Sequence, residues 1–412
     1  MVSCNNRQRG HVAAAAAAVC GPGASFRMAV EPRLVLHFDV NETIMVGDPA
    51  GGDTFEDCLN KICAKSAVVR TVPETERATS GRWTQWTWYD GTPLDPDVRA
   101  AQGLTDPPPL LEDWEFGQEP AGCSSFYKTD ELKKAFAKSF TEDGSPGVIY
   151  RGIYEKMEKA LRCGPEVATD RRLCHDGVHH FLLPAFFFTL TALRDAGRQF
   201  SLVIRTFGTD GPKVVEALQA FSEGAHSFAA VPEIAASLSE SPQWTGSYRV
   251  QGEGSVFVLQ SEGGETVSNE AAVVAALTKP ATAISAVCCQ DDYKWWRGHD
   301  YSPSAGKPLW VTIDETSITH PIFFDDNIHN DAVDSIVAVR VATSSPVGEE
   351  SGGYAALTGE STIAMQGLVL KRTPTWCPIL DEGWFVHQIG VSEANLAAAR
   401  QDGRWERFTQ MR

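Results

Sequence analysis

The feature that most constrains the fold is a series of short apolar runs that alternate with helix-like segments. The runs have the length and the β-branched or aromatic content of buried strands, and they lie at 34–39, 200–206, 282–289, 322–324 and 336–340. Helical patterns with apolar faces occupy 54–65, 181–196, 213–221 and 392–400. Apolar strands alternating with helices predict an α/β fold, a doubly wound parallel sheet that is covered on both faces.

Two long interruptions of this alternation predict inserted modules. The core is expected to comprise 31–65, 179–221 and 280–412, and the insertions to comprise 66–178 and 222–279. The first insertion contains an aromatic cluster from Trp83 to Tyr89, which we interpret as a packed core, and helical patterns at 128–139 and 149–162. The second contains a predicted hairpin at 247–259.

Acidic residues outnumber basic ones, which limits the classes of partner. Asp and Glu together number 53, Lys and Arg number 36, and the formal net charge is −17. This sign excludes nucleic acid and an anionic membrane as the main partner, but it leaves room for a small phosphorylated molecule in a local positive pocket. The ten Cys residues form no CxxC pair, which favours reduced thiols over a disulfide framework or a zinc site.

The first 30 residues differ from the rest of the chain. They contain Arg7, Arg9 and Arg27 but no acidic residue, a composition typical of either a targeting leader or a disordered tail. No later stretch reaches the roughly 18 apolar residues of a membrane span. We therefore expect a soluble protein that is cytoplasmic, or organellar if the leader is a transit peptide, and not secreted. The oligomeric state is left open.

Polar residues at the ends of the predicted strands carry the functional question, because ligands of open parallel sheets bind outside the carboxyl ends of the strands. The first run ends at Asp39, the second at Thr206 and the fourth at Asp325 and Asp326, and Lys307 precedes the fourth run. An Asp carboxylate is a competent nucleophile toward phosphorus, and carboxylates from two strands can hold Mg²⁺ together. A hydroxyl and an ammonium group can bind phosphoryl oxygens. The pattern therefore indicates phosphoryl transfer.

The order of these motifs resembles that of the haloacid dehalogenase-like (HAD) hydrolase superfamily. Asp-x-Asn-x-Thr after an apolar run comes first, then a strand ending in Thr, then Gly-Lys-Pro, and then Asp-Asp-x-x-x-Asn after another apolar run. The resemblance implies a Rossmannoid core with cap modules that choose the substrate. It does not identify a subfamily, and it covers about 33–62, 179–221 and 280–340.

The resemblance also implies roles for single residues in Mg²⁺-dependent phosphate hydrolysis. Asp39 would be the nucleophile that forms an aspartyl-phosphate, and Thr206 and Lys307 would bind the phosphate. Mg²⁺ would be held by Asp39, by the backbone carbonyl of Asn41 and by Asp326 with Asp325. The supporting residues of these motifs would be Thr43 and Asn330.

Three further charged residues near the predicted strand ends are not part of the assigned site. Lys294 is a rival to Lys307 for the phosphate-binding ammonium group. Asp291 and Asp292 follow the third run and are expected to be solvated rather than to face the site. These residues show where spacing alone leaves a choice open.

One residue departs from the pattern of the superfamily. Its phosphatases usually carry an Asp two residues after the nucleophile, which protonates the leaving group and later activates water, whereas this chain has Asn41. An amide cannot shuttle a proton at neutral pH, and general acid–base catalysis is worth about 10²–10⁴-fold in rate. The sequence therefore predicts a phosphohydrolase that is slow or restricted to good leaving groups.

Two alternatives keep the same scaffold. The first is a catalytically silent protein that binds a phosphorylated ligand or a protein partner. The second is an enzyme that cleaves a carbon–halogen or carbon–phosphorus bond.

Overall fold

The computed structural model describes residues 31–47, 52–111, 122–252, 254–312, 319–329, 335–342, 353–357 and 359–408. All elements named below belong to one compact unit, Pro32–Arg412. The predicted leader at 1–30 and the predicted supporting residue Asn330 lie outside the described residues. Within the described part of the chain, no helix is both long and apolar enough to cross a membrane.

The protein is an α/β protein built on an eight-stranded, mostly parallel sheet. From one edge to the other its strands are β14 (Leu370–Arg372), β11 (Thr319–Asp325), β1 (Arg33–Asp39), β5 (Phe200–Thr206), β9 (Ile284–Gln290), β6 (Trp244–Gln251), β7 (Gly254–Ser261) and β8 (Thr266–Val267). Neighbours are parallel from β14 to β6, and the last two pairs are antiparallel. The predicted α/β class with a parallel sheet is therefore confirmed.

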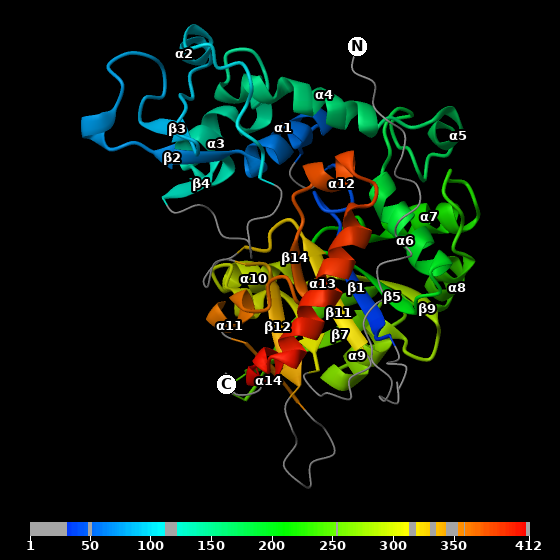
Figure 1. Ribbon diagram of the computed structural model, residues 1–412. Coiled ribbons are helices and arrows are strands. Elements are labelled where there is room, and N and C mark those ends of the chain that lie inside the picture. Colours follow the sequence, from blue (N-terminus) through cyan, green and yellow to red (C-terminus); the bar gives the residue numbers. More distant parts are fainter. Residues whose placement is uncertain are drawn as a thin grey trace, which may run out of the picture. The chain divides into compact units, whose positions relative to one another are not determined.

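Alternating residues of β1 pack on opposite faces of the sheet, as the period of a strand requires. Leu36 and Phe38 belong to a cluster with helices on one face, while Val35 belongs to a cluster on the other. The first face is covered by α6 (Pro184–Asp195), α7 (Gly211–Ser222), α8 (Pro232–Glu240) and α13 (Trp384–Gln401) (Figure 1). The second is covered by α9 (Glu270–Thr278) and by the strand β10 (Lys307–Val311). Every residue of β1 is buried, which explains its continuous apolar run.

The strand predicted at 336–340 is present, but its expected place in the main sheet is wrong. It is β12 (Val337–Ala342), which pairs with β10 and with β13 (Tyr354–Ala356) in a separate three-stranded sheet. A parallel neighbour in the same sheet needs a crossover of about a dozen residues or more, usually through a helix. The segment from Asp325 to Val337 is too short for such a helix, and the place beside β11 is taken by β14.

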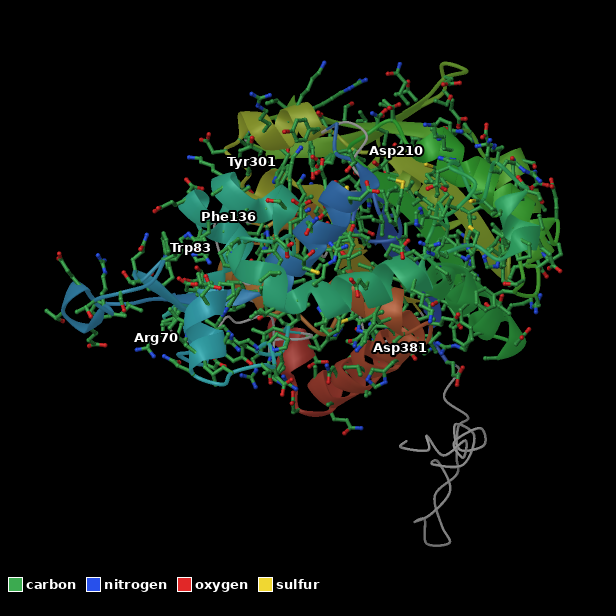
Figure 2. All side chains as sticks on the ribbon, turned by 90° about the horizontal axis from the view of Figure 1, so that it is seen from above. Arg70, Trp83, Phe136, Asp210, Tyr301 and Asp381 are labelled. Atoms are coloured by element: carbon green, nitrogen blue, oxygen red, sulfur yellow. The ribbon has the colours of Figure 1, made fainter. Side chains whose placement is uncertain are left out.

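The segment predicted as the first insertion carries its own small sheet and core. The sheet has the order β3 (Trp86–Trp88), β2 (Val68–Thr71) and β4 (Cys123–Ser125). Its helices are α2 (Pro96–Ala101), α3 (Asp130–Phe136), α4 (Arg151–Ala160) and α5 (Pro165–Ala168), and the preceding helix α1 (Phe55–Ser66) packs against this core (Figure 1). Trp88 is fully buried against α1 residues, so the predicted packed aromatic core is confirmed at this position. Trp83 packs edge-on against Phe136, with 5.3 Å between ring centroids (Figure 2).

Local capping and tertiary packing account for where the helices begin and end. Thr54 caps α1 through a reciprocal pair of hydrogen bonds with Asp57, as its position before the apolar pattern predicts. The last long helix is longer than the predicted 392–400, because Phe385 and Ile389 in its first half pack on the main sheet. The remaining helices are α10 (Tyr293–Gly298), α11 (Gly359–Ile363), α12 (Trp376–Leu380) and α14 (Arg404–Arg407).

The predicted hairpin is present as β6 and β7, with Gly252 at a positive φ of 61° in its turn. It does not stand apart from the core. The residues Trp244 and Thr245 pair with the end of β9, so the hairpin extends the main sheet.

Candidate active site

The carboxyl ends of neighbouring strands bring Asp39 and Asp325 together. The strand β1 lies between β11 and β5, and Phe38 is in register with Phe324, so the two aspartates follow at equivalent positions. Both side chains are buried. The sequence places these residues far apart, and the parallel pairing of their strands makes them neighbours.

Lys307 joins these two carboxylates. It is the first residue of β10, and its buried Nζ donates hydrogen bonds to Oδ1 of Asp39 and, at 2.9 Å, to Oδ2 of Asp325. Lys294, its rival in the sequence, lies exposed on α10. Of the two candidates, Lys307 is therefore the one that contacts the predicted nucleophile.

Asp326 completes a group of three buried carboxylates. Oxygen atoms of Asp39, Asp325 and Asp326 all lie within 4.8 Å of one another. The following residue, Asn327, holds the pair in place. Its backbone N–H donates to Asp325 Oδ1 at 2.8 Å, and its side-chain amide donates to Asp326 Oδ1 at 2.9 Å.

Thr43 links the loop after β1 to the loop after β11. Its hydroxyl donates to Asp39 Oδ2 at 3.2 Å and accepts from the backbone N–H of Asp326 at 3.1 Å. The predicted supporting residue therefore contacts both carboxylate-bearing loops, and it orients the Asp39 carboxylate from the side opposite Lys307.

Two residues of the site, Glu42 and Lys65, were not predicted. Lys65 Nζ donates to Asp326 Oδ2 at 2.6 Å and also pairs with the Glu42 carboxylate. Glu42 has a positive φ of 55° and is held by a hydrogen bond from the Thr375 hydroxyl to its carbonyl. A non-glycine residue in this region is strained by roughly 1–3 kcal/mol, and such strain often lies at functional sites. The only sequence signal was the place of Lys65 in the last turn of a predicted helix, which is common for lysines without a function.

The electrostatics of the site are dominated by burial of like charges. Burial raises the pKa of Asp39 well above its ordinary value, the carboxylates of Asp325 and Asp326 raise it further, and Lys307 opposes them. Burial likewise raises the pKa of Asp326 to about 7, with Glu42 and Asp325 adding to the effect and Lys65 opposing it. Burial lowers the pKa of Lys307, but its two carboxylate partners outweigh this effect and raise it overall. Lys307 therefore stays charged.

The donor set fits a hard divalent cation. Four carboxylates, of Asp39, Glu42, Asp325 and Asp326, share two ammonium groups, of Lys65 and Lys307. When all are ionised this leaves an excess of two negative charges in a buried place, which is unfavourable without compensation. Carboxylate oxygens are the ligands that Mg²⁺ prefers, and a divalent ion matches the excess. The residues present therefore fit the ion that the motifs imply.

Asn41 has a structural partner of its own. Its side-chain Nδ2 donates to the backbone carbonyl of Gly47 at 3.1 Å and so helps to close the loop after β1. The amide is half-buried. This hydrogen bond is one that a carboxylate at position 41 could not make, because an ionised Asp has no donor.

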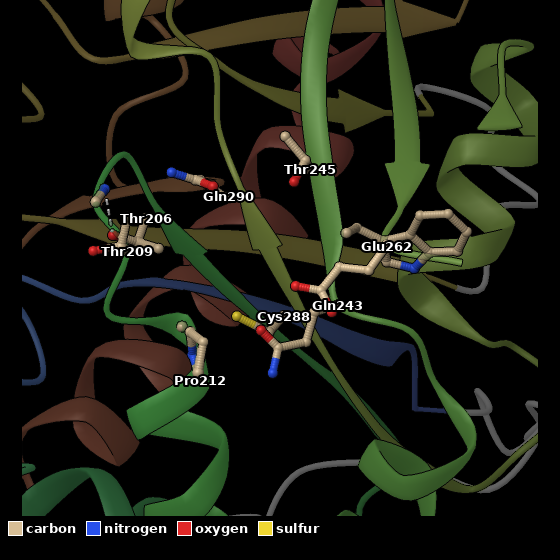
Figure 3. A pocket seen from close by; sticks show the side chains of 11 residues that line it. Thr206, Thr209, Pro212, Gln243, Thr245, Glu262, Cys288 and Gln290 are labelled. Atoms are coloured by element: carbon tan, nitrogen blue, oxygen red, sulfur yellow. Dashed lines mark hydrogen bonds between the residues drawn. The ribbon is translucent and has the colours of Figure 1, made fainter. Parts of the chain in front are cut away.

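Thr206 ends β5 one residue beyond Arg205, the register partner of Asp39. Its hydroxyl accepts from the backbone N–H of Gly208 at 2.9 Å and lines a cavity of about 230 Å³ between α7, β6 and β9. Thr206 and Thr209 lie together on one side of this cavity (Figure 3). Among the described residues no hydrogen bond joins Thr206 to Asp39 or Lys307, so a role in phosphate binding stays a prediction.

A buried ion pair behind the site corrects the expectation for Asp291. This residue is not solvated, because its carboxylate accepts from Arg205 Nε at 3.0 Å and pairs with the same guanidinium a second time. Arg205 also donates to the carbonyl of Pro308 at 2.9 Å, next to Lys307. Asp292 accepts from the N–H groups of Trp295 and Tyr248 and caps α10. Both acids are structural, and Asp291 helps to position the segment that carries Lys307.

Comparisons of the chain with protein-family models, with curated proteins and with solved structures found no match.

Proposed function

We propose that this protein is a Mg²⁺-dependent phosphohydrolase of the haloacid dehalogenase-like type, with Asp39 as the nucleophile and a Rossmannoid core that carries cap-like insertions. One observation carries the proposal. Residues far apart in the sequence, Asp39, Lys307 and Asp325 with Asp326, meet in one buried cluster at the carboxyl ends of adjacent parallel strands. This is the arrangement that aspartyl-phosphate chemistry needs.

In the proposed reaction, an oxygen of the Asp39 carboxylate attacks the phosphorus atom of the substrate. A bond forms between this oxygen and phosphorus, and the bond from phosphorus to the leaving oxygen breaks with its electron pair. Lys307 and Thr43 each hold one oxygen of Asp39 before the attack. Water then attacks the phosphorus of the aspartyl-phosphate, and the bond from phosphorus to the Asp39 oxygen breaks with its electron pair. This restores the carboxylate and releases inorganic phosphate, while one proton of the water passes to the solvent. Asp39, Asp325 and Asp326 would hold Mg²⁺, which supplies positive charge to the phosphoryl oxygens when it is bound.

Protonation of the leaving group is the step for which this chain offers the least support. Asn41 donates to Gly47 and has no proton to give at neutral pH. Substrates whose leaving groups have a low pKa, such as acyl phosphates, phosphoanhydrides and aryl phosphates, need little protonation. We therefore propose that hydrolysis is restricted to such substrates, and that alkyl monoesters turn over slowly.

The test is a series of aryl phosphates whose leaving groups differ in pKa, assayed with Mg²⁺ and with EDTA. The wild type is expected to hydrolyse only the activated members, with a steep dependence on leaving-group pKa. Asp39→Asn should fall to the background rate, and Asn41→Asp should gain up to about 10²-fold on the poorer leaving groups and flatten the dependence. Asp143→Asn, an exposed aspartate, is the matched control. Full activity of Asp39→Asn would refute the proposal.

The hydrogen bond of Asn41 favours one alternative, a protein on the same scaffold that binds a phosphorylated ligand or a protein partner without turnover. Position 41 then serves the loop rather than a proton transfer. This alternative predicts stabilisation by Mg²⁺ or by phosphate in a melting assay and no hydrolysis of any aryl phosphate. Detection of a phosphorylated Asp39 by mass spectrometry would exclude it.

A further inference from the structure

A larger cavity adjoins the carboxylate cluster on the side of Asp326. Its volume is about 460 Å³, which lies within the range of small-molecule sites. The walls come from the end of α1, from the end of β4 through α3, and from the residues that follow β11 and end β14. Asp326 belongs both to this lining and to the group of carboxylates around Asp39. A ligand in the cavity therefore lies next to the proposed reaction centre.

The cavity concentrates positive charge. Lys65, Lys128, Lys133 and Arg372 line it, against the two carboxylates of Asp130 and Asp326. Asp326 is already paired with Lys65. The chain as a whole carries a net charge of −17, so this excess of cations differs from the average of the protein.

Among the described residues, two of these cations line the cavity without a carboxylate in ion-pair contact. Within the described residues, no Asp or Glu lies within ion-pair distance of Lys128 or Lys133. Lys133 Nζ instead lies 4.3 Å from the centroid of the Tyr127 ring, and Lys65 Nζ lies 5.4 Å from the same centroid. Burial and the charge of Lys65 lower the pKa of Lys133, and the Asp130 carboxylate opposes them only in part.

His329, which also lines the cavity, is exposed to the same positive charges. Burial lowers its pKa to about 2, and the charges of Lys128, Arg372 and Lys65 contribute in that order. Cationic groups from the insertion and from the core therefore act on one point of the cavity. An anion placed there would be attracted by all of them.

We propose that this cavity binds a second anionic group, a phosphate or a carboxylate, of the same substrate whose reacting phosphate lies at Asp39. This inference rests on the proposed function, and it narrows the substrate to small molecules that carry two anionic groups. Lys128 and Lys133 hold the second group.

The experiment compares matched ligand pairs by calorimetric titration of the full chain in Mg²⁺ at fixed ionic strength. One pair is 3-phosphoglycerate and glycerol 3-phosphate, which differ by a carboxylate near the phosphate. The other is fructose 1,6-bisphosphate and fructose 6-phosphate, which differ by a more distant phosphate. In one of the two pairs, we expect the ligand with two anionic groups to bind at least tenfold more tightly than its partner. Preference in the first pair would identify the second anion as a carboxylate, and preference in the second pair would identify it as a phosphate.

Variants place this preference in the cavity. The double variant Lys128→Gln/Lys133→Gln should reduce the ratio of the two affinities toward one, because the second anionic group loses both ammonium partners. Lys134→Gln, on the same helix as Lys133 but outside the lining, should keep the ratio of the wild type. All three lysines are exposed, so folding is not at risk.

Each outcome bears on the inference. A wild type without preference in either pair, or a double variant that keeps the preference, would overturn it. Preference for two anionic groups without turnover of any aryl phosphate would support the binding site and refute the hydrolase. Turnover without preference would overturn the cavity inference and leave the hydrolase standing.

Discussion

Replacing Arg205 by Met should destabilise the protein strongly, because it leaves the Asp291 carboxylate buried without its partner. The side chains are 0% and 1% exposed, respectively. The described side-chain hydrogen bonds of Asp291 both come from Arg205, one of them at 3.0 Å. The same substitution removes the donor to the carbonyl of Pro308.

The expected magnitude follows from these contacts. Breaking a buried ion pair by removing one partner costs about 3–5 kcal/mol, and the lost hydrogen bond to Pro308 adds about 1 kcal/mol. Replacing both partners by apolar residues of similar size removes the unpaired charge. The double variant Arg205→Met/Asp291→Leu should therefore be less destabilised than the sum of the two single variants by at least about 2 kcal/mol.

The assay is urea unfolding followed by tryptophan fluorescence. It compares the free energies of unfolding of the wild type, the two single variants and the double variant, with one common slope of this free energy against urea concentration. The control cycle uses Arg151→Met and Glu155→Leu, an exposed pair one helical turn apart, whose coupling should be about 0.3–0.5 kcal/mol. If the effects at Arg205 and Asp291 add within about 0.5 kcal/mol, the buried pair is not what holds these strand ends.

Three further predictions concern the metal, the hydroxyl at the site and acid stability. Mg²⁺ should raise the melting temperature of the wild type but not of Asp326→Asn, and an equal rise in both would argue against the carboxylate site. Thr43→Val should lower kcat in the aryl phosphate assay, while Thr43→Ser, which keeps the hydroxyl, should restore it; two equal losses would mean that shape rather than hydrogen bonding matters. Burial lowers the pKa of His226 to about 4 in the folded protein, whereas an unperturbed His has a pKa of about 6.5. As the pH falls below about 6.5, the unfolded chain therefore binds a proton at His226 that the folded protein does not bind, and stability is lost. At pH 5 this residue should lower the free energy of unfolding by about 2 kcal/mol. Urea unfolding of His226→Asn at a series of pH values should therefore show a smaller decrease of this free energy below about pH 6.5 than the wild type. An equal decrease in both proteins would contradict the role given to His226.

The sequence predicted the parts of the site that lie at the ends of its own apolar runs. Asp39 and Asp325 follow runs whose burial on both faces is visible in composition alone, and parallel pairing then brings the ends together. That Lys307 lies near these carboxylates could be expected only from the order of the motifs along the chain. Its contact with both carboxylates depends on β10, which lies outside the main sheet.

The residues that were missed depend on contacts between distant segments. Asp291 was expected to be solvated, and Arg205 lies in a predicted buried strand without an evident partner. Only the pairing of β5 with β9 makes them a buried pair. Lys65 looks like an ordinary helix-terminal lysine until α1 is placed beside the loop after β11. No periodicity or spacing within one segment reports such contacts, because each partner lies beyond the window in which a local pattern forms.

Helix α1 ties the insertion to the site through a single element. One side of it, with Leu59 and Ile62, forms the core of the insertion together with Trp88. Its last turn carries Lys65, which holds Asp326 and lines the larger cavity. The position of one ammonium group relative to the carboxylates therefore depends on packing within the insertion. Packing of α1 against residues of the predicted insertion therefore sets the position of a charge on which both the proposed metal ligands and the proposed second anion site depend.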